Sequence, residues 1–148
     1  MIKFLFMINP YPYLAYRNDP HPKTLAFCLF QPNSDRYDPG SKITYTNIFD
    51  ALVNAVKSVL KGLGFPNAEI VVAEIGWPYY SDSDEVGATV ENARAFIWNL
   101  MSHLRSMKGT LLMLEKSMDM YIFTLYDKDL SPGRCRSDPL ASSDRISP

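Results

Sequence analysis

The sequence predicts an α/β fold in which parallel strands alternate with helices, and three observations lead to that prediction. Short apolar runs typical of buried strands occur three times. Two longer stretches between them have apolar residues at helical spacing. The resulting order is strand, loop, helix, strand, loop, helix, strand, which is typical of parallel strands joined by helical crossovers. A parallel sheet is normally covered on both faces, and three strands with two helices are too few to do this. The sequence therefore predicts part of a larger domain.

The first predicted strand covers residues 2–9, an apolar run that is closely followed by prolines. Residues 17–42 are predicted to form a long loop, because turn signals such as Asp38-Pro39-Gly40 occur within it. Inside this loop, the apolar patch Leu25–Phe30 is expected to pack onto the body of the fold.

The first predicted helix covers residues 45–63, where apolar residues recur every three or four positions until Gly64 supplies a stop. The second predicted strand, residues 69–74, is rich in isoleucine and valine. The loop at residues 76–87 then carries acidic and serine residues.

The second predicted helix begins after Thr89, a good N-cap residue. Its apolar face continues to Met107, and Gly109 is the expected stop. The third predicted strand covers residues 119–126.

Composition and charge exclude several classes of function. A net charge of -1 and a pI near 6.1 give no electrostatic case for binding nucleic acid or an anionic membrane. No apolar run approaches the roughly 20 residues of a membrane span. The apolar run at residues 4–8 is shorter than the apolar region of a signal peptide, which is about 7–15 residues long. No signal peptide, spanning segment, nucleic acid or protein partner is therefore predicted.

Two histidines and two cysteines are too few and too separated for a metal site. Neither a metal nor another cofactor is predicted. Cys28 and Cys135 could form a disulfide in a secreted chain, but two unpaired thiols are the simpler expectation.

Glu74 is the most informative residue of the sequence. Side chains alternate along a strand, so Ile70, Val72 and Glu74 are expected to share one face. This arrangement would place a carboxylate at the carboxyl end of a buried strand, where parallel α/β folds hold their active sites. The alternative is a carboxylate that simply emerges into solvent at the end of the strand, and periodicity alone leaves both readings open.

Several blocks of sequence point to a family. Residues 73–78 read Ala-Glu-Ile-Gly-Trp-Pro and residues 9–16 read Asn-Pro-Tyr-Pro-Tyr-Leu-Ala-Tyr. Together with blocks at residues 30–33, 45–51, 84–93 and 121–126, they resemble glycoside hydrolase family 17, the plant endo-1,3-β-glucanases. The resemblance covers about residues 4 to 133. It implies part of a TIM (β/α)8 barrel, roughly strands 6 to 8 with their helices, so residues 1–133 are expected to be the C-terminal part of that barrel.

The resemblance implies retaining hydrolysis of β-1,3-glucan with Glu74 as the nucleophile. That mechanism needs a second carboxyl group about 5–5.5 Å away to protonate the leaving oxygen. In the family this acid/base glutamate lies in a Gly-Asn-Glu segment after the fourth strand, and no Gly-Asn-Glu occurs in this sequence. The chain is therefore expected to be truncated and inactive alone. The alternative is a non-catalytic β-glucan-binding or interaction protein.

Four residues are candidates for contact with the β-1,3-glucan. Asn9 and Tyr11 match family positions that line the sugar site beside the nucleophile, and Tyr13 is nearby in the sequence. Trp77 could form a stacking wall, but it could equally be a structural corner after the strand, and Tyr13 could be plain loop packing. The resemblance also implies secretion to the cell wall or apoplast, with lipid anchors in some members.

The sequence departs from the family pattern at several positions. Ile75 replaces the usual Thr or Ser beside the nucleophile, and Lys128 stands where the family has an acidic residue. Residues 134–148 match nothing in the family as written and are expected to be a disordered or frameshifted tail. One choice of codons for residues 139–148, read in another frame, encodes Phe-Gly-Leu-Phe-Arg-Pro-Asp-Leu-Thr, which resembles the expected continuation. Open strand edges and apolar barrel-facing residues also predict poor solubility.

Overall fold

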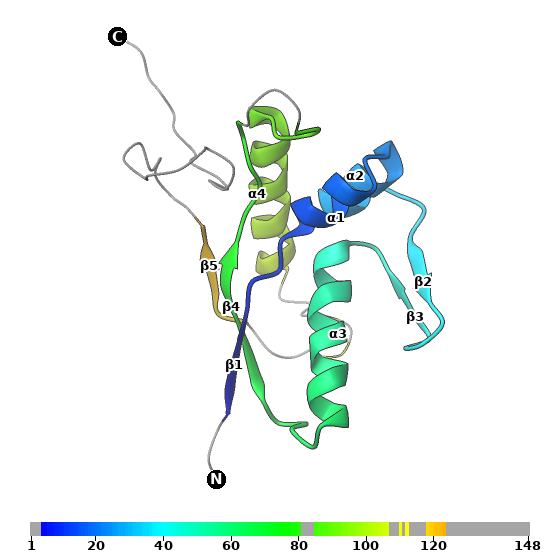
Figure 1. Cartoon of the computed structure of the whole chain (residues 1–148), viewed down its shortest axis with the longest axis vertical. Coiled ribbons are helices and arrows are strands. Elements are labelled where there is room, and N and C mark those ends of the chain that lie inside the picture. Colours follow the sequence, from blue (N-terminus) through cyan, green and yellow to red (C-terminus); the bar gives the residue numbers. More distant parts are fainter. Residues whose placement is uncertain (1–3, 81–84, 107–109, 111, 113–117, 124–148) are drawn as a thin grey trace.

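The computed structural model describes residues 4–80, 85–106, 110, 112 and 118–123 (Figure 1). Helices and strands follow one another in the order that the sequence predicts for an α/β fold, with additional short elements after the first strand. The elements are β1 (Leu5–Ile8), α1 (Pro12–Asn18), α2 (Pro22–Cys28), β2 (Arg36–Asp38), β3 (Ile43–Tyr45), α3 (Ile48–Gly62), β4 (Glu69–Ile75), α4 (Val90–Arg105) and β5 (Met120–Ile122).

The main sheet has the strand order β1-β4-β5, and both strand pairs are parallel. Leu5 pairs with Glu69 at one end of the β1-β4 ladder, and Ile8 pairs with Val72 at the other. The helices α3 and α4 precede β4 and β5 respectively and lie on one side of the sheet (Figure 1). The predicted parallel strands with helical crossovers are thereby confirmed.

The residues predicted as a loop, 17–42, contain regular structure, and that prediction is wrong. The helix α2 lies inside this range, and β2 pairs with β3 as an antiparallel hairpin. Pro22 occupies the first turn of α2, where its fixed φ suits a helix and its missing N–H costs nothing. The expected packing of Leu25–Phe30 is confirmed, because Phe27, Cys28 and Leu29 are all buried.

The helix α3 begins later than predicted. The side chain of Asn47 accepts a hydrogen bond from the backbone N–H of Asp50 at 2.8 Å, so Asn47 is the N-cap. Tyr45, the predicted first residue, belongs to the hairpin instead. The predicted stop is confirmed, since Gly64 has a φ of +89° just after the helix.

The helix α4 begins as predicted. The Thr89 hydroxyl accepts a hydrogen bond from the backbone N–H of Asn92 at 3.2 Å. Its buried residues, Ala93, Phe96 and Leu100, recur three and four positions apart, as an amphipathic helix requires. The predicted stop at Gly109 and the predicted tail at 134–148 lie outside the described residues, as does the end of the third predicted strand.

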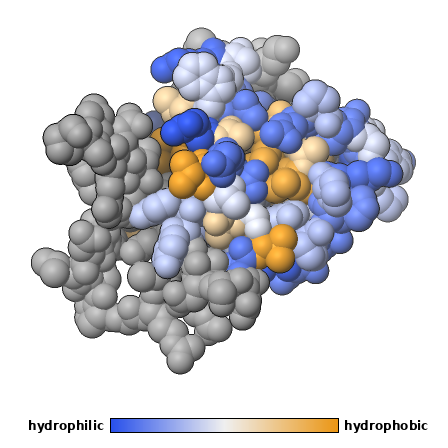
Figure 2. All heavy atoms as spheres, turned by 90° about the horizontal axis from the view of Figure 1, so that it is seen from above, coloured by the Kyte–Doolittle hydropathy of each residue, from blue (hydrophilic) through white to orange (hydrophobic). Residues whose placement is uncertain are grey.

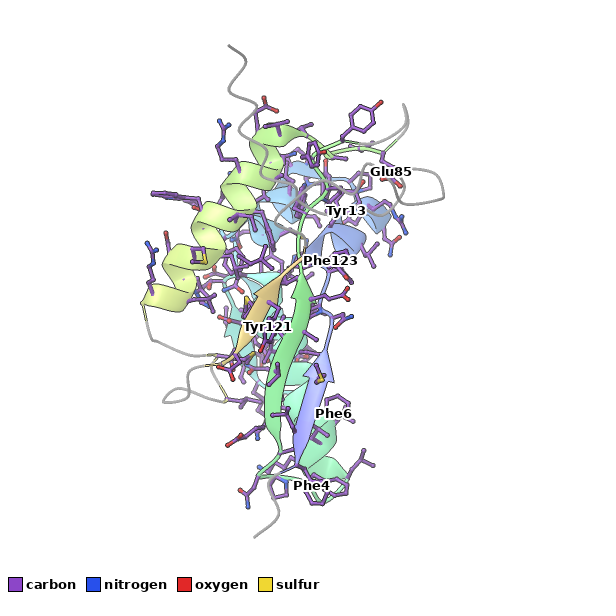
Figure 3. All side chains as sticks on the ribbon, turned by 90° about the vertical axis from the view of Figure 1, so that its left-hand side faces the viewer. Phe4, Phe6, Tyr13, Glu85, Tyr121 and Phe123 are labelled. Carbon is purple, nitrogen blue, oxygen red and sulfur yellow. The ribbon has the colours of Figure 1, made fainter. Side chains whose placement is uncertain are left out.

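The hydrophobic core lies between the sheet and the helices. Ile70, Val72 and Ile75 of β4 contribute to it, with Phe49 from α3 and Phe96 from α4. The opposite face of the sheet is open in the described part of the chain (Figure 3). There Leu5 and Met7 are each 60% exposed and Tyr121 is 62% exposed.

Candidate active site

The strand β4 contains a bulge that determines where Glu74 lies. Along the ladder to β5, Val72 pairs with Met120 and Ile75 pairs with Ile122, so β4 has one more residue than its partner over this stretch. Val72 and Ile75 are both fully buried in the core under the helices. Glu74, next to Ile75, therefore lies on the opposite, open face. The prediction that Glu74 shares a face with Ile70 and Val72 is wrong, because simple alternation takes no account of a bulge.

The Tyr11 hydroxyl donates a short hydrogen bond to the Oε2 atom of Glu74. Tyr11 follows β1 and Glu74 is the last residue but one of β4, so the contact joins residues from the carboxyl ends of two neighbouring parallel strands. Burial, the hydrogen bond to Glu74 and the charge of that carboxylate all raise the pKa of Tyr11. The phenol consequently stays protonated and remains a donor at neutral pH.

Asn9 lies immediately after β1, two residues before Tyr11, and its side chain is exposed. The structure thus brings Asn9, Tyr11 and Glu74 to one edge of the sheet. Figure 2 shows the end of the molecule toward which the strands run, where hydrophilic residues surround a few hydrophobic ones.

Tyr13 is largely buried, and its hydroxyl contacts a residue that sequence reasoning missed. The hydroxyl donates to Glu85 at 3.4 Å, and Arg17 forms an ion pair with the same carboxylate at 3.7 Å. Burial, followed by the charge of Glu85, raises the pKa of Tyr13 to about 12. Tyr13 and Arg17 stand four residues apart on α1, a spacing that gives two side chains on one helix face. That spacing was the available signal, but it does not identify Glu85 as the partner.

Trp77 is a core residue. Its side chain has no exposed surface, and its indole Nε1 donates to the carbonyl of Gly87 at 2.9 Å. Tyr16 stacks on the indole with ring centroids 6.0 Å apart, and the centroid of the Phe96 ring lies 5.5 Å from that of the indole. A sugar cannot stack on a ring with no accessible face, so Trp77 has the structural role rather than that of a stacking wall.

Gly87 links Trp77 to the start of α4. Its carbonyl accepts a second hydrogen bond, from Asn92 Nδ2 at 3.0 Å, and its φ is +82°. A Cβ at this position would lie 2.3 Å from the Tyr16 ring, so only glycine fits. Gly87 is thereby held against Tyr16 of α1.

Other predicted features can be placed more briefly. Ile75 is buried in the core, on the side of β4 away from Glu74, whereas Lys128 lies outside the described residues. Cys28 is a buried free thiol whose pKa is raised to about 12 by burial, and Cys135 is outside the described residues. Among the residues that the structure describes, no three His, Cys, Asp or Glu side chains group so that they could hold a metal ion. No helix in that part of the chain is long and apolar enough to cross a bilayer.

The chain resembles several known proteins. The model of the family described as glycosyl hydrolases family 17 matches residues 2–138. The chain is 59% identical, over 86% of its length, to glucan endo-1,3-beta-glucosidase 7 of Arabidopsis thaliana. It is 57% identical, over the same share, to glucan endo-1,3-beta-D-glucosidase of Olea europaea. These matches span 25% and 28% of the two relatives, so the chain covers about a quarter of their length.

A solved structure is also similar. CJP38, a beta-1,3-glucanase and allergen of Cryptomeria japonica pollen, superposes with a TM-score of 0.75 at 40% identity. The match covers 87% of this chain and 38% of that one. A plant beta-glucan endohydrolase superposes with a TM-score of 0.71 at 27% identity.

Proposed function

The chain belongs to glycosyl hydrolases family 17, and from this membership we propose that it carries the nucleophile side of the active site of a retaining endo-1,3-β-glucanase. The likeness to plant β-glucanase structures confirms the predicted fold, part of a (β/α)8 barrel with an incomplete parallel sheet. Glu74 is the proposed nucleophile, and β-1,3-glucan is the proposed substrate.

The hydrogen bond from Tyr11 to Glu74 carries this proposal. A nucleophilic carboxylate must present one oxygen to the anomeric carbon in a fixed direction. The Tyr11 phenol holds Oε2, which leaves Oε1 of Glu74 for the attack. The exposed amide of Asn9 lies on the same edge and is proposed to bind a sugar hydroxyl. Tyr13 is proposed to contact substrate less directly, because its hydroxyl is already bonded to Glu85.

Two steps make up the proposed reaction. In the first, a Glu74 oxygen bonds to the anomeric carbon as the glycosidic C–O bond breaks, and a carboxylic acid protonates the leaving oxygen. In the second, water attacks the same carbon, the bond to Glu74 breaks, and the other carboxylate takes the proton from the water. Because no Gly-Asn-Glu occurs in the 148 residues, we propose that they do not hydrolyse glucan by themselves.

A substrate that needs no acid tests the nucleophile directly. The anomeric fluoride of 2-deoxy-2-fluoro-β-laminaribiosyl fluoride departs without protonation. The fluorine at C2 slows release of the sugar from the enzyme. The expected result is a covalent glycosyl adduct on the peptide that contains Glu74, detected by mass spectrometry, and none in Glu74→Gln. The Tyr11→Phe variant should label more slowly, because Oε2 loses its donor. An adduct elsewhere, or none with the native chain, would contradict the proposal.

Hydrolysis of laminarin provides the complementary measurement. Neither the native chain nor Glu74→Gln should release reducing sugar, and turnover that depends on Glu74 would refute the proposed inactivity. The absence of Gly-Asn-Glu also favours a second candidate, a non-catalytic β-glucan-binding protein. That candidate predicts retention on insoluble β-1,3-glucan without any labelling of Glu74.

A further inference from the structure

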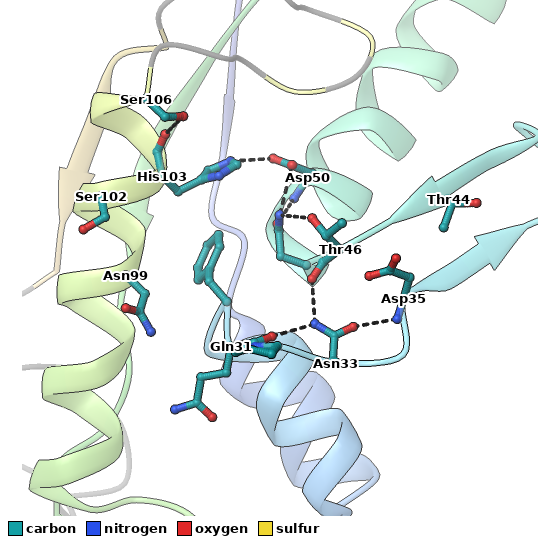
Figure 4. Close-up of a pocket in the computed structure, with 13 residues that line it drawn as sticks. Gln31, Asn33, Asp35, Thr44, Thr46, Asp50, Asn99, Ser102, His103 and Ser106 are labelled. Carbon is teal, nitrogen blue, oxygen red and sulfur yellow. Dashed lines mark hydrogen bonds and ion pairs between the residues drawn. The ribbon is translucent and has the colours of Figure 1, made fainter.

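A cavity of about 900 Å³, lined mostly by residues with polar side chains, lies apart from the candidate active site. Its walls come from the segment after α2, the end of β3, the start of α3 and the last turns of α4 (Figure 4). None of Asn9, Tyr11 and Glu74 lines it. In Figure 4 the strands of the main sheet run behind the helices, so the cavity opens on the helix side of the molecule. Its volume lies within the range of about 300–1,000 Å³ that is common for ligand sites.

The side chains around the cavity are suited to a neutral ligand with many hydroxyl groups. Most of its described lining residues carry amides, hydroxyls or carboxylates, and neither lysine nor arginine is among them. A phosphate or an acidic sugar would therefore meet no lysine or arginine among the described residues, and it would meet the carboxylates of Asp35 and Asp50 instead. Gln31, Asp35 and Thr44 are exposed, and none of their side chains bonds to another residue in the described part of the chain. Their polar atoms are available to a ligand.

Phe30 supplies an aromatic surface within the same cavity. It stands just after the end of α2 with a φ of 56°, where the N–H of Gln31 bonds to the carbonyl of Ala26 at 2.9 Å. Such helix ends normally have glycine at this position, and a bulky residue with positive φ is strained. Here the ring is half-buried and packs 5.2 Å from the ring of His103. An aromatic face beside polar groups is what recognition of a sugar ring requires.

The polar wall is fixed before any ligand arrives. The Asn33 amide donates to the carbonyls of Gln31 and Thr46, both at 2.8 Å, and its oxygen accepts from the backbone N–H of Asp35 at 2.9 Å. Across the cavity, His103 Nε2 lies 3.0 Å from Asp50 Oδ1, which joins α4 to α3. Because these bonds are already made, the backbone that carries Gln31 and Asp35 needs little further ordering on binding.

We propose that this cavity is a second, non-catalytic site that binds a segment of β-1,3-glucan. The identity of the polymer rests on the proposed function, whereas the preference for a neutral, hydroxyl-rich ligand rests on the cavity itself. Gln31, Asp35 and Thr44 bind sugar hydroxyls, and a glucosyl ring lies on Phe30. A polymer is long enough for one chain to be held here while another segment reaches the sheet edge.

Native gel electrophoresis of the whole chain, in gels with increasing soluble β-1,3-glucan, tests the site. Mobility relative to a gel without glucan gives the dissociation constant. The pair Gln31→Ala and Asp35→Asn should weaken binding about tenfold, because the first removes an amide and the second replaces a charged acceptor with a weaker neutral one. Asparagine tolerates the positive φ of 47° at position 35, so the fold should persist. Thr44→Val is a conservative second variant and should weaken binding by a smaller factor.

Two further pairs identify where binding occurs. Asn67→Ala with Asp119→Asn removes the same chemical groups from exposed positions elsewhere and should leave retardation unchanged. Tyr11→Phe with Glu74→Gln alters the sheet edge, and most of the retardation by glucan should remain in this variant. No retardation of the native chain, or equal losses in the cavity pair and the matched pair, would overturn the proposal. Loss of glucan retardation in the sheet-edge pair alone would overturn the proposed second site and would support the proposed function. Failure to label Glu74 with retained cavity binding would refute only the proposed function.

Discussion

The two faces of the β1-β4-β5 sheet carry similar apolar residues but differ in burial at several positions. On the helix side, Val72 and Ile75 have no exposed surface, whereas Leu5 and Met7 on the other side are each 60% exposed. Residue type therefore does not decide burial here. A face of a sheet is buried only where a second layer packs on it, and no described residue forms such a layer on the open face. The comparison separates a core that the described residues complete from a surface that they leave uncovered.

Truncation of a large side chain on the helix side should have the largest effect. Phe96 is fully buried and packs 5.5 Å from Trp77, so Phe96→Ala is expected to lower the free energy of unfolding by about 3–5 kcal/mol. Urea denaturation followed by circular dichroism measures this loss. Trp98→Ala, on the same helix but 72% exposed, is the control and should change stability by no more than about 0.5 kcal/mol. Equal losses would show that the helix side is not a packed core.

A single added methyl group should also be costly on the helix side. Gly87→Ala forces a Cβ against the Tyr16 ring at a positive φ, so a loss of about 1–3 kcal/mol is expected. Gly62→Ala is the matched control, because a Cβ there meets nothing within 4 Å. In that helix the alanine should stabilise the chain by up to about 1 kcal/mol. If both substitutions proved neutral, the close contact with Tyr16 would not exist in solution.

The attachment of the helix layer should depend measurably on the cap of α4. Thr89→Ala removes the acceptor for the Asn92 N–H and should cost about 1 kcal/mol. Thr89→Ser retains a hydroxyl at the cap and should recover most of the loss. The same denaturation measurement distinguishes the two variants, and identical values for them would mean that the cap contributes nothing.

Substitutions on the open face should have the smallest effect on stability. Met7→Ser removes an apolar side chain that is already in contact with solvent, so the free energy of unfolding should change by no more than about 0.5 kcal/mol. The variant should nevertheless associate less with itself in analytical ultracentrifugation, because the open face presents apolar surface at an unpaired strand edge. A large destabilisation would indicate that this face is covered in solution.

Local signals in the sequence predicted much of the fold. The Thr89 cap and the Gly64 stop each depend on a residue and its immediate neighbours, so both could be read directly. The role of Pro22 was missed, because a proline that opens a helix resembles one that punctuates a loop. Asn47 was overlooked as a cap because the apolar spacing continued back to Tyr45.

The candidate site could be predicted less fully, since it depends on contacts between distant segments. The position of Glu74 in the sequence identified it, but its face was misassigned because the bulge is defined only by pairing with β5. The partnership of Glu85 with Tyr13 and Arg17 joins residues about 70 positions apart and leaves no local pattern. The burial of Trp77 likewise depends on Tyr16 and Phe96, which flank it from two other elements.

The bulge in β4 has a consequence for how this strand can change in evolution. Glu74 and Ile75 are neighbours in the chain, but one faces the proposed substrate and the other faces the packed interior. Selection on chemistry and selection on stability therefore act on adjacent codons almost independently. Ile75 therefore belongs to the packed interior, and its side chain takes no part in the face that carries Glu74.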